Sequence, residues 1–568
     1  MENLIILMRI LFLSVSFWGY IQFVSKYIRR ELAVGFVFCS IGSMMFFAGI
    51  LNVLVLAAWG IAFTGVGLAC FSLYRREPLP RCSSWGTVFF LIGSLFFLFL
   101  LYGSKFTHYD NFSHWALPPR IMIQYHRFPN LSDPYYKFQS YPLGSSVFIY
   151  YFAEITGVSS EWFQMFAQAI LLLGLVAGVF VFTAKFSSAM LAAICSVMLL
   201  CSNIAFTDLM VDTLLPLIGL SGILFCLYYK NSMIKMLPFT IPYSVFLISV
   251  KNSGIFFVAV IIALAWYYTT SDKTRFVYRA GVLLSPFITL MVWTLHVKRV
   301  FPQGLASKHS LSLSNFETVF QDKQLEDVLT IITSILRRTF TLSNAALLLI
   351  FMAAILWLFR KHICTPAGTV LPDLLCLTLV SYLVYQLGTI GMYIFSMPQD
   401  EAVMLAGYER YHQTILTFLS GLVLTGFLLT VENIPANQCR ALSLSLLCSI
   451  LLFWALNPAL DFLCRQDLTG SDRQRFDAFF EEYHVLPYCR YAIIVSKDRT
   501  DYGYLHYLSR YREETQEREI ITDNNLETSD WCIFDYILFF EETDATRTFL
   551  KIHFPEVTGP VVDLNKYR

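Results

Sequence analysis

Charged residues are scarce in this sequence, and their scarcity excludes most classes of soluble protein. Asp, Glu, Lys and Arg make up 14% of the 568 residues, whereas hydrophobic residues make up 56%. Soluble domains average about 25% charged and about 45–50% apolar residues. The charges are also unevenly placed, because 34 of the 81 fall within residues 461–568. The composition therefore excludes an ordinary soluble enzyme, a disordered chain and a collagen-like fibre.

Signatures of metal, nucleotide and nucleic-acid binding are also missing. The thirteen cysteines are scattered, mostly within apolar runs, and no C-x-x-C pair or His cluster at zinc spacing occurs. We expect these cysteines to be small buried hydrophobes, and no metal ligand is predicted. No strongly basic block is present, so no nucleic-acid partner is expected. Residues 461–568 contain no G-x-G-x-x-G or P-loop sequence, and we assign no chemistry to them.

What the sequence does contain is a series of long apolar runs. A helix needs about 20 apolar residues to cross the core of a bilayer, and about fourteen segments have roughly this length. The sequence therefore predicts a mainly α-helical, polytopic transmembrane domain over residues 1–460 and a small α/β soluble domain over residues 461–568. The predicted spans are 4–24, 32–51, 53–74, 85–103, 160–182, 187–206, 210–229, 233–250, 254–270, 279–296, 343–360, 369–391, 413–431 and 441–458.

The distribution of Lys and Arg gives the predicted spans an orientation, because these residues concentrate in cytoplasmic loops. The loops rich in Lys and Arg can all be cytoplasmic only if the apolar stretch Tyr141–Phe152 does not cross the membrane. At roughly a dozen residues it is too short to span comfortably, and we expect an interfacial or re-entrant helix. The basic loops that this orientation places inside contain Lys26–Arg30, Arg75–Arg81, Lys230–Lys235, Lys273–Arg279 and Arg360–His362.

Three loops then become exoplasmic, namely 104–159, 297–342 and 392–412, together with the C-terminal domain. The unusual polar residues gather on this side. We therefore expect a multi-pass protein of the cytoplasmic membrane whose functional site faces outward. Within the loop 297–342, residues 325–336 have the pattern of an amphipathic helix lying on the membrane surface.

The C-terminal domain alternates apolar runs typical of strands with runs typical of helices. The pattern predicts strands at 491–496, 520–522 and 531–540. Helices are predicted at 502–512 and 545–552.

The richest polar segment is His108-Tyr-Asp-Asn-Phe-Ser-His-Trp115 in the first predicted outer loop. Asp110 lies just past the end of a predicted membrane helix, where an acid can act as general base on a substrate held at the interface. His114 is one helical turn further on and would share a face with Asp110. A solvated loop acid among interfacial aromatics is the alternative interpretation of the same residues.

Two further segments complete a pattern. Tyr141-Pro-Leu-Gly144 follows about thirty residues later, and the turn Phe206-Thr-Asp-Leu-Met-Val-Asp212 precedes another predicted span. This order of features resembles the sequence pattern of the GT-C glycosyltransferases. That pattern is an acid after an outward helix, a His or Tyr one turn later, a Pro-containing stretch and then a second acid at the start of a span. These are polytopic enzymes that use lipid-phosphate-linked sugars. The resemblance covers roughly residues 85–255 and the plan of an outer C-terminal domain.

The resemblance implies roles for individual residues. Asp110 would be the general base, and His114 and Asp212 would orient the acceptor or the base. Asp212 matches the acid of the second segment best, and Asp208 matches it second. The sequence departs from the family at Asn111, where a second acid is often found, and in having three or more spans before the loop. The first departure weakens the case for metal binding there, so no cofactor is specified, although a divalent cation stays open.

Basic residues at two other positions resemble basic residues that the family commonly has at the corresponding places. Lys251 lies between two apolar spans, where it either snorkels to the interface or meets a ligand phosphate. Arg410, followed by Tyr411, resembles the late Arg-Tyr pair of the family and suits bidentate contact with phosphate. An ion pair with Glu409, Glu401 or Asp400 is the alternative for Arg410. Two more residues, Arg120 and Lys137, are candidates for sugar or phosphate contact, or for lipid headgroup contact.

These observations give three hypotheses about function. The first is a membrane glycosyltransferase that moves a sugar from a polyprenyl-phosphate donor to a glycan, lipid or protein acceptor in the cell envelope. The second is a transporter or flippase of envelope lipids, which predicts ionisable residues at mid-membrane. The third is an envelope polysaccharide polymerase or ligase. The position of the ionisable residues and the importance of Asp110 distinguish the three.

Overall fold

A computed structural model of the chain describes residues 2–75, 84–133, 135–270, 275–302, 313–341, 370–432, 437, 465–486, 489–513 and 518–568. The predicted spans 343–360 and 441–458 and the domain boundary at 460 lie outside these residues. So do most of the predicted basic loops at 76–81, 271–274 and 360–362.

Within the described ranges, the chain is mainly helical, and eight helices are long and apolar enough to cross a membrane. The eight segments are Asn3–Val24, Arg30–Ile50, Leu54–Tyr74, Glu161–Phe182, Met233–Val250, Phe276–Val300, Leu371–Phe395 and Tyr408–Val431. Each coincides with a predicted span. These helices indicate a membrane protein.

Four other predicted spans form shorter apolar helices of 15 to 17 residues. The sequence therefore overestimated the length of these segments. Around 201–213 the reason is local, because polar side chains bond to the chain and interrupt the helix: Asn203 Nδ2 donates to the carbonyl of Arg410, and Thr213 Oγ1 accepts from the amide of Ile204. The predicted spans 187–206 and 210–229 accordingly end and begin around an irregular turn.

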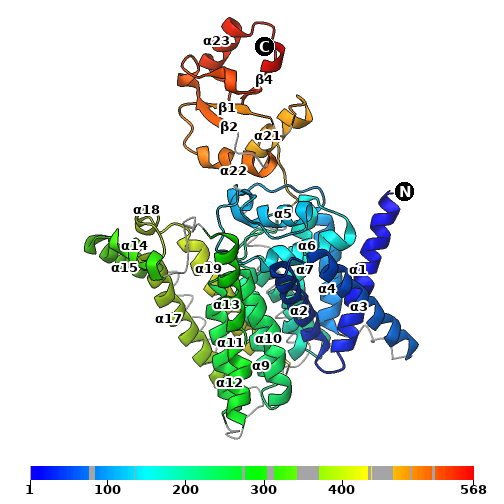
Figure 1. Ribbon diagram of the computed structural model, residues 1–568. Coiled ribbons are helices and arrows are strands. Elements are labelled where there is room, and N and C mark those ends of the chain that lie inside the picture. The colour runs from blue at the N-terminus through cyan, green and yellow to red at the C-terminus, as the bar shows by residue number, and fades with distance from the viewer. Residues whose placement is uncertain are drawn as a thin grey trace.

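The helices of the bundle follow the chain in the order shown in Figure 1. They are α1 (Glu2–Val24), α2 (Arg30–Ile50), α3 (Leu54–Tyr74), α4 (Trp85–Leu101), α7 (Glu161–Val176) with its 3-10 continuation η2 (Ala177–Phe182), α8 (Phe186–Leu200), α9 (Leu214–Tyr228), α10 (Met233–Val250), α11 (Gly254–Thr269), α12 (Phe276–Leu284), α13 (Phe287–Val300), α17 (Leu371–Phe395) and α19 (Tyr408–Val431). Pro286, which cannot donate a backbone hydrogen bond, separates α12 from α13.

Shorter elements lie between the bundle helices. They are the π-helical turn η1 (Asn111–Trp115), α5 (Leu117–Tyr125), α6 (Gly144–Thr156), α14 (Leu313–Gln321), α15 (Leu325–Thr339) and α18 (Gln399–Val403). Figure 1 places them at the end of the bundle that also carries the C-terminal domain, which we call the C-domain end. At the opposite end, the backbone amide of Arg29 donates to the Tyr229 hydroxyl, and the Tyr268 hydroxyl donates to Asp373.

Helix α6 contains the apolar stretch that the orientation argument required not to cross. It has 13 residues, and both of its ends lie at the C-domain end of the bundle. Its first residue, Gly144, packs against the backbone of Ser249 near the end of α10. At its other end, Arg9 near the start of α1 donates to the carbonyls of Glu154 and Ile155. The segment therefore runs across the end of the bundle.

The C-terminal domain contains a four-stranded sheet of order β2-β1-β3-β4. Strand β1 pairs in parallel with β2 and β3, and β4 closes the sheet antiparallel to β3. Apolar residues of β1 are fully buried between helices on the two faces. The elements are α21 (Asp472–Glu481), β1 (Tyr491–Val495), α22 (Tyr502–Glu513), β2 (Arg518–Thr522), η6 (Asp523–Asn525), η7 (Trp531–Ile533), β3 (Tyr536–Phe539), α23 (Asp544–His553), β4 (Val561–Asp563) and η8 (Leu564–Lys566).

One predicted strand of this domain, 531–540, was too long. The side chain of Asp530 accepts from the amide of Cys532 and starts the 3-10 turn η7, so the strand begins only at Tyr536. The sequence prediction also missed α21 and β4. Strand β4 is only three residues long and is fixed by pairing with β3 rather than by its own pattern.

Candidate functional site

Asp110 lies in the loop that connects α4 to α5 at the C-domain end. It directly precedes the π-helical turn η1, in which the amide of Ala116 bonds to the carbonyl of Asn111. The sequence predicted an ordinary helical turn between Asp110 and His114; the actual turn is wider because of this bonding pattern. His114 still lies close enough for its charge to act on Asp110. Its ring packs against those of Phe138 and Tyr141.

Four predicted site residues form one chain of ion pairs. Arg410 Nη1 donates to Asp110 Oδ2 at 2.6 Å, and Arg410 Nε lies 3.4 Å from Asp212 Oδ2. On its other oxygen, Asp212 Oδ1 accepts from Lys251 Nζ at 3.2 Å. The two carboxylates therefore contact the same guanidinium group, and the structure brings Asp110, Asp212, Lys251 and Arg410 together from four separate parts of the chain.

These pairs differ from the alternatives that the sequence left open. Lys251 does not snorkel outward, because it pairs with Asp212. Arg410 pairs with Asp110 and Asp212 instead of a neighbouring acid, whereas Glu409 pairs with Arg338 at 3.3 Å. Arg410 lies in the first turn of α19, which begins at Tyr408.

Within this chain of ion pairs, the two cations are more exposed to solvent than the two carboxylates. The side chains of Arg410 and Lys251 are 26% and 13% exposed, whereas those of Asp110 and Asp212 are 6% and 2% exposed. Among the described residues, Asp212 Oδ2 and Arg410 Nε are buried and have no hydrogen-bond partner, although they face each other as an ion pair. An anion that approaches the cluster meets positive charge first.

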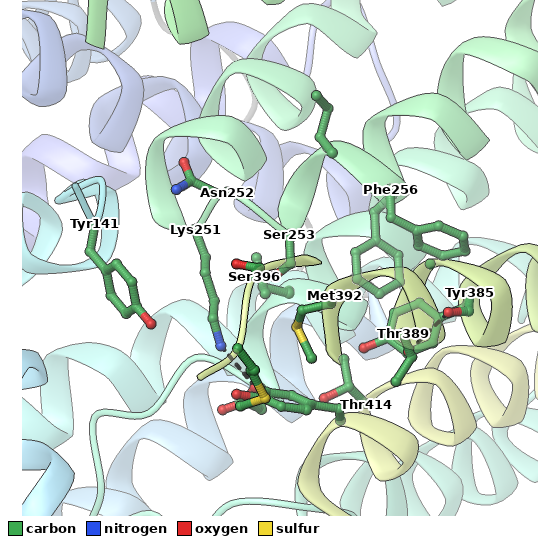
Figure 2. A pocket seen from close by; sticks show the side chains of 17 residues that line it. Tyr141, Lys251, Asn252, Ser253, Phe256, Tyr385, Thr389, Met392, Ser396 and Thr414 are labelled. Atoms are coloured by element: carbon green, nitrogen blue, oxygen red, sulfur yellow. Dashed lines mark hydrogen bonds and ion pairs between the residues drawn. The ribbon is translucent and has the colours of Figure 1, made fainter. Parts of the chain in front are cut away.

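A cavity of about 310 Å³ lies beside the ion-pair cluster and leads to it. Figure 2 shows Lys251 reaching across it from the end of α10, with Tyr141 on one side and Phe256 and Tyr385 on the other. Most of its wall comes from the bundle helices α11, α17 and α19. Its two charged lining residues, Asp212 and Lys251, pair with each other and form what we call the polar end, whereas most of the remaining wall is apolar.

Aromatic rings surround the Lys251 ammonium group. Its Nζ lies 5.7 Å from the ring centre of Trp115 and 5.4 Å from that of Tyr411. The Tyr411 ring is also 5.5 Å from Cζ of Arg410. Tyr411 thus contacts both cations, and cation–π attraction favours this arrangement of the two positive groups.

Asn111, which stands where the resembling family often has an acid, joins two loops. Its Nδ2 donates to Asp208 Oδ1 at 2.8 Å, and its Oδ1 accepts from the amide of Leu209 at 2.9 Å. An amide can donate and accept at once, whereas an ionised carboxylate can only accept. Asn111 therefore anchors the Asp110 loop to the turn that carries Asp208 and Asp212, and Asp208 has a structural role.

Burial and neighbouring charges act differently on the two loop acids. Burial on its own would raise the pKa of Asp110, but the charges of His114 and Arg410, with the hydrogen bond from Arg410, hold that pKa below its ordinary value. For Asp208, burial raises the pKa. Burial, with the charge of Asp110, also raises the pKa of Tyr109 to about 12. The pKa values of the two neighbouring acids are thus shifted in opposite directions.

Two candidate residues lie away from the cavity. Arg120 Nη2 donates to the carbonyl of Arg512 in the C-terminal domain, and its guanidinium stacks on the Tyr511 ring at 4.9 Å. Lys137 is exposed and is not among the residues that line the cavity. Neither residue lines the cavity, and Arg120 instead contacts the C-terminal domain; their contact with sugar or phosphate stays a prediction.

The cluster does not offer a donor set for a divalent cation. Asp110 and Asp212 both face Arg410, so a cation would meet the positive guanidinium between them. In the described part of the chain, no group of three or more His, Cys, Asp or Glu side chains is arranged to hold a metal ion.

The sequence did not predict several residues that shape the site. Asn111 was noted only as a departure. Tyr385 and Thr389 fell within the predicted span 369–391 and Met392 at the start of the predicted loop 392–412, and no role was predicted for them, although all three line the cavity. The available sequence signal was the placement of Tyr385, Gly388 and Thr389 about one helical turn apart on α17. Comparison with protein-family models, with curated proteins and with solved structures gave no match for this chain.

Proposed function

We propose that this protein transfers a glycosyl group from a lipid-phosphate donor to an acceptor hydroxyl, with Asp110 as general base. The lipid would occupy the apolar body of the cavity, and its phosphate would lie at the polar end against Lys251 and Arg410. The observation that carries the proposal is a cavity, walled by bundle helices, whose lining residues Lys251 and Asp212 connect through Arg410 to the buried carboxylate of Asp110.

The chemistry follows from the arrangement of charges. Asp110 takes the proton from the acceptor hydroxyl while the hydroxyl oxygen attacks the anomeric carbon. The bond between that carbon and the phosphate oxygen breaks, and the lipid phosphate leaves with the electron pair. Lys251 and Arg410 stabilise the negative charge that develops on it. A single displacement of this kind inverts the anomeric centre.

The pairing of Arg410 with Asp110 has a consequence for substrate order. While Arg410 holds Asp110 at 2.6 Å, the carboxylate is a weak base because its pKa is depressed. A phosphate that draws the guanidinium toward itself weakens this bond and makes Asp110 more basic. Donor binding therefore prepares the base.

The position of the ionisable residues supports a transferase over a transporter. Lys251 directly follows the last residue of α10, and Arg410 lies in the first turn of α19. A transporter or flippase is expected to place such groups near the bilayer midplane. An envelope polymerase or ligase remains the alternative that Asp110 variants distinguish.

We also propose that the C-domain end faces outward and the opposite end faces the cytoplasm. The short connections of the opposite end, with the first turns of the helices that follow them, contain Lys26, Arg29, Arg30, Lys230 and Lys235, in accord with the enrichment of basic residues in cytoplasmic loops. A tag after Ser471 should therefore be accessible to an impermeant label from outside intact cells, and a tag within residues 271–277 should not. Labelling with the reverse pattern would contradict an outward-facing site.

Two glycines of α17 allow a matched test of the cavity. A side chain at Gly388 or at Gly391 would meet no atom within 4 Å of its Cβ, but only Gly388 belongs to the cavity wall as described. Gly388→Leu should fill part of the cavity and weaken donor binding by about tenfold or more. The reason is that each methylene group of the lipid that can no longer be buried there costs about 0.8 kcal/mol of binding free energy. Thermal stability should change little in either variant.

The measurement is binding of a fluorescent polyprenyl-phosphate sugar to the purified protein in nanodiscs. Gly391→Leu is the control and should bind as the unmodified protein does. Equal binding by both variants would place the lipid elsewhere.

A further inference from the structure

The loop that leads to Asp110 is held by side chains from outside the loop. The amide of Lys105 donates to Gln466 Oε1 at 2.8 Å, and Gln466 Nε2 donates back to the Lys105 carbonyl at 2.8 Å. At the next residue, the amide of Phe106 donates to Glu161 Oε2 at 2.7 Å, and Arg473 Nη1 donates to the Phe106 carbonyl at 3.2 Å. All four backbone polar groups of two consecutive residues are thus fixed.

Arg473 is the centre of this arrangement and is almost fully buried, with 2% of its side chain exposed. It pairs with Glu161 of α7 at 3.0 Å and with Asp477 at 3.0 Å. Asp477 also pairs with Lys105 at 2.8 Å. A buried ion network is costly to form and costly to break by removing one partner. It fixes a geometry more than it adds stability.

Aromatic rings of α22 cover the same loop from the C-terminal domain. The Tyr511 ring contacts those of Phe106 and Phe112, with centroid distances of 6.2 and 5.3 Å. Tyr504 contacts Phe112 edge-on, and Arg473 lies over the Phe112 ring at 5.6 Å. Phe112 is two residues from Asp110. Figure 1 shows α21 and α22 at the base of the domain, next to the bundle.

We propose that the C-terminal domain is a clamp that holds Asp110 in its working position, with Gln466 and Arg473 as positioning residues. The domain supplies three of the four backbone bonds at 105–106, the fourth coming from Glu161 of α7, and the rings that cover Phe106 and Phe112. Its contribution to transfer rests on the function proposed above. Misplacing a reacting group by about 1 Å can cost about 10²-fold in rate, so loosening the clamp should lower turnover more than donor binding.

The test combines hydrogen exchange with transfer kinetics on full-length variants in nanodiscs. Gln466→Ala removes both bonds to Lys105, and Gln466→Glu retains an acceptor for its amide but cannot donate to its carbonyl. Arg473→Gln removes the buried cation. The control is Arg547→Gln, which removes an exposed arginine of α23, at the end of the domain away from the bundle.

We expect amide exchange in peptides covering residues 105–116 to rise at least tenfold in Gln466→Ala and Arg473→Gln, and by less in Gln466→Glu. The kcat for transfer should fall about tenfold or more with a nearly constant KM for the donor. Because Gln466 is only half-buried, its variants keep the test decisive if Arg473→Gln does not fold.

Unchanged exchange in the Gln466 variants would overturn the clamp, and so would raised exchange with unchanged kcat. Exchange is measured without substrate, so it separates the two proposals. If the unmodified protein transfers no sugar, the proposed function fails, and the exchange result still decides whether the domain holds this loop.

Discussion

Replacing Asp110 by Asn is expected to lower the rate of glycosyl transfer by about 10²–10⁴-fold. Asn keeps the size of the side chain and can still accept a hydrogen bond from Arg410, but it cannot take a proton from the acceptor. Donor binding should be nearly unchanged, because the phosphate is bound by Lys251 and Arg410. Transfer from a radiolabelled polyprenyl-phosphate sugar by the purified variant in lipid is the measurement.

A second buried aspartate in the same loop region provides a matched control. Asp133 is as buried as Asp110 and pairs with Arg127 at 2.7 Å, but it lies outside the ion-pair cluster around Arg410. Asp133→Asn should cost stability similar to or greater than that lost in Asp110→Asn, while transfer per folded molecule stays near that of the unmodified protein. Full activity in Asp110→Asn would refute the base assignment and leave Asp212 as the next candidate.

Removing the positive charge of Arg410 is expected to weaken both donor binding and turnover. A charge-assisted hydrogen bond contributes about 1.5–3 kcal/mol, so Arg410→Gln should bind the donor about 10- to 100-fold more weakly. Its cation contacts the phosphate in the ground state and in the transition state, and both binding and rate therefore depend on it. Titration of the fluorescent donor and single-turnover transfer measure the two effects separately.

The same variant also tests the electrostatic coupling to Asp110. The charge of Arg410 is one cause of the lowered pKa of Asp110; without it that pKa rises, and the acid limb of the pH–rate profile should move to higher pH. Arg338→Gln is the control, because Arg338 forms an exposed pair with Glu409 in the neighbouring turn, and exposed pairs contribute about 0–1 kcal/mol. An acid limb that does not move in Arg410→Gln would contradict the pairing.

The parts of the fold that could be predicted are those with a local signal. The lengths of the apolar runs predicted the positions of the spans that the structure describes. The shortness of Tyr141–Phe152 predicted a helix that does not cross the membrane. Helix ends were harder to predict, because the irregular turn at 201–213 depends on a bond that Asn203 donates to the distant Arg410 and on a bond that Thr213 accepts from the amide of Ile204, nine residues earlier. Likewise, the capping of η7 by Asp530 is a side-chain effect that alternating hydrophobicity does not reveal.

The site was predictable to the extent that unusual residues stood in apolar surroundings. Asp110, Asp212, Lys251 and Arg410 were each conspicuous for that reason, and they meet in one cluster. No local sequence pattern shows which residue each charged side chain pairs with. The pairing of Arg410 with two acids 300 and 198 positions earlier, and the use of Arg120 to hold the C-terminal domain, arise from packing between segments far apart in the sequence.

The most direct measurement of the central claim is an electron cryomicroscopy map of Asp110→Asn in nanodiscs with a polyprenyl-phosphate sugar. The variant binds the donor but turns it over slowly, so the complex should persist. We expect the phosphate within hydrogen-bond distance of Lys251 Nζ and the Arg410 guanidinium, with the lipid running through the cavity along α11 and α17. Density for the phosphate at another site, with this cavity containing no lipid, would contradict the account.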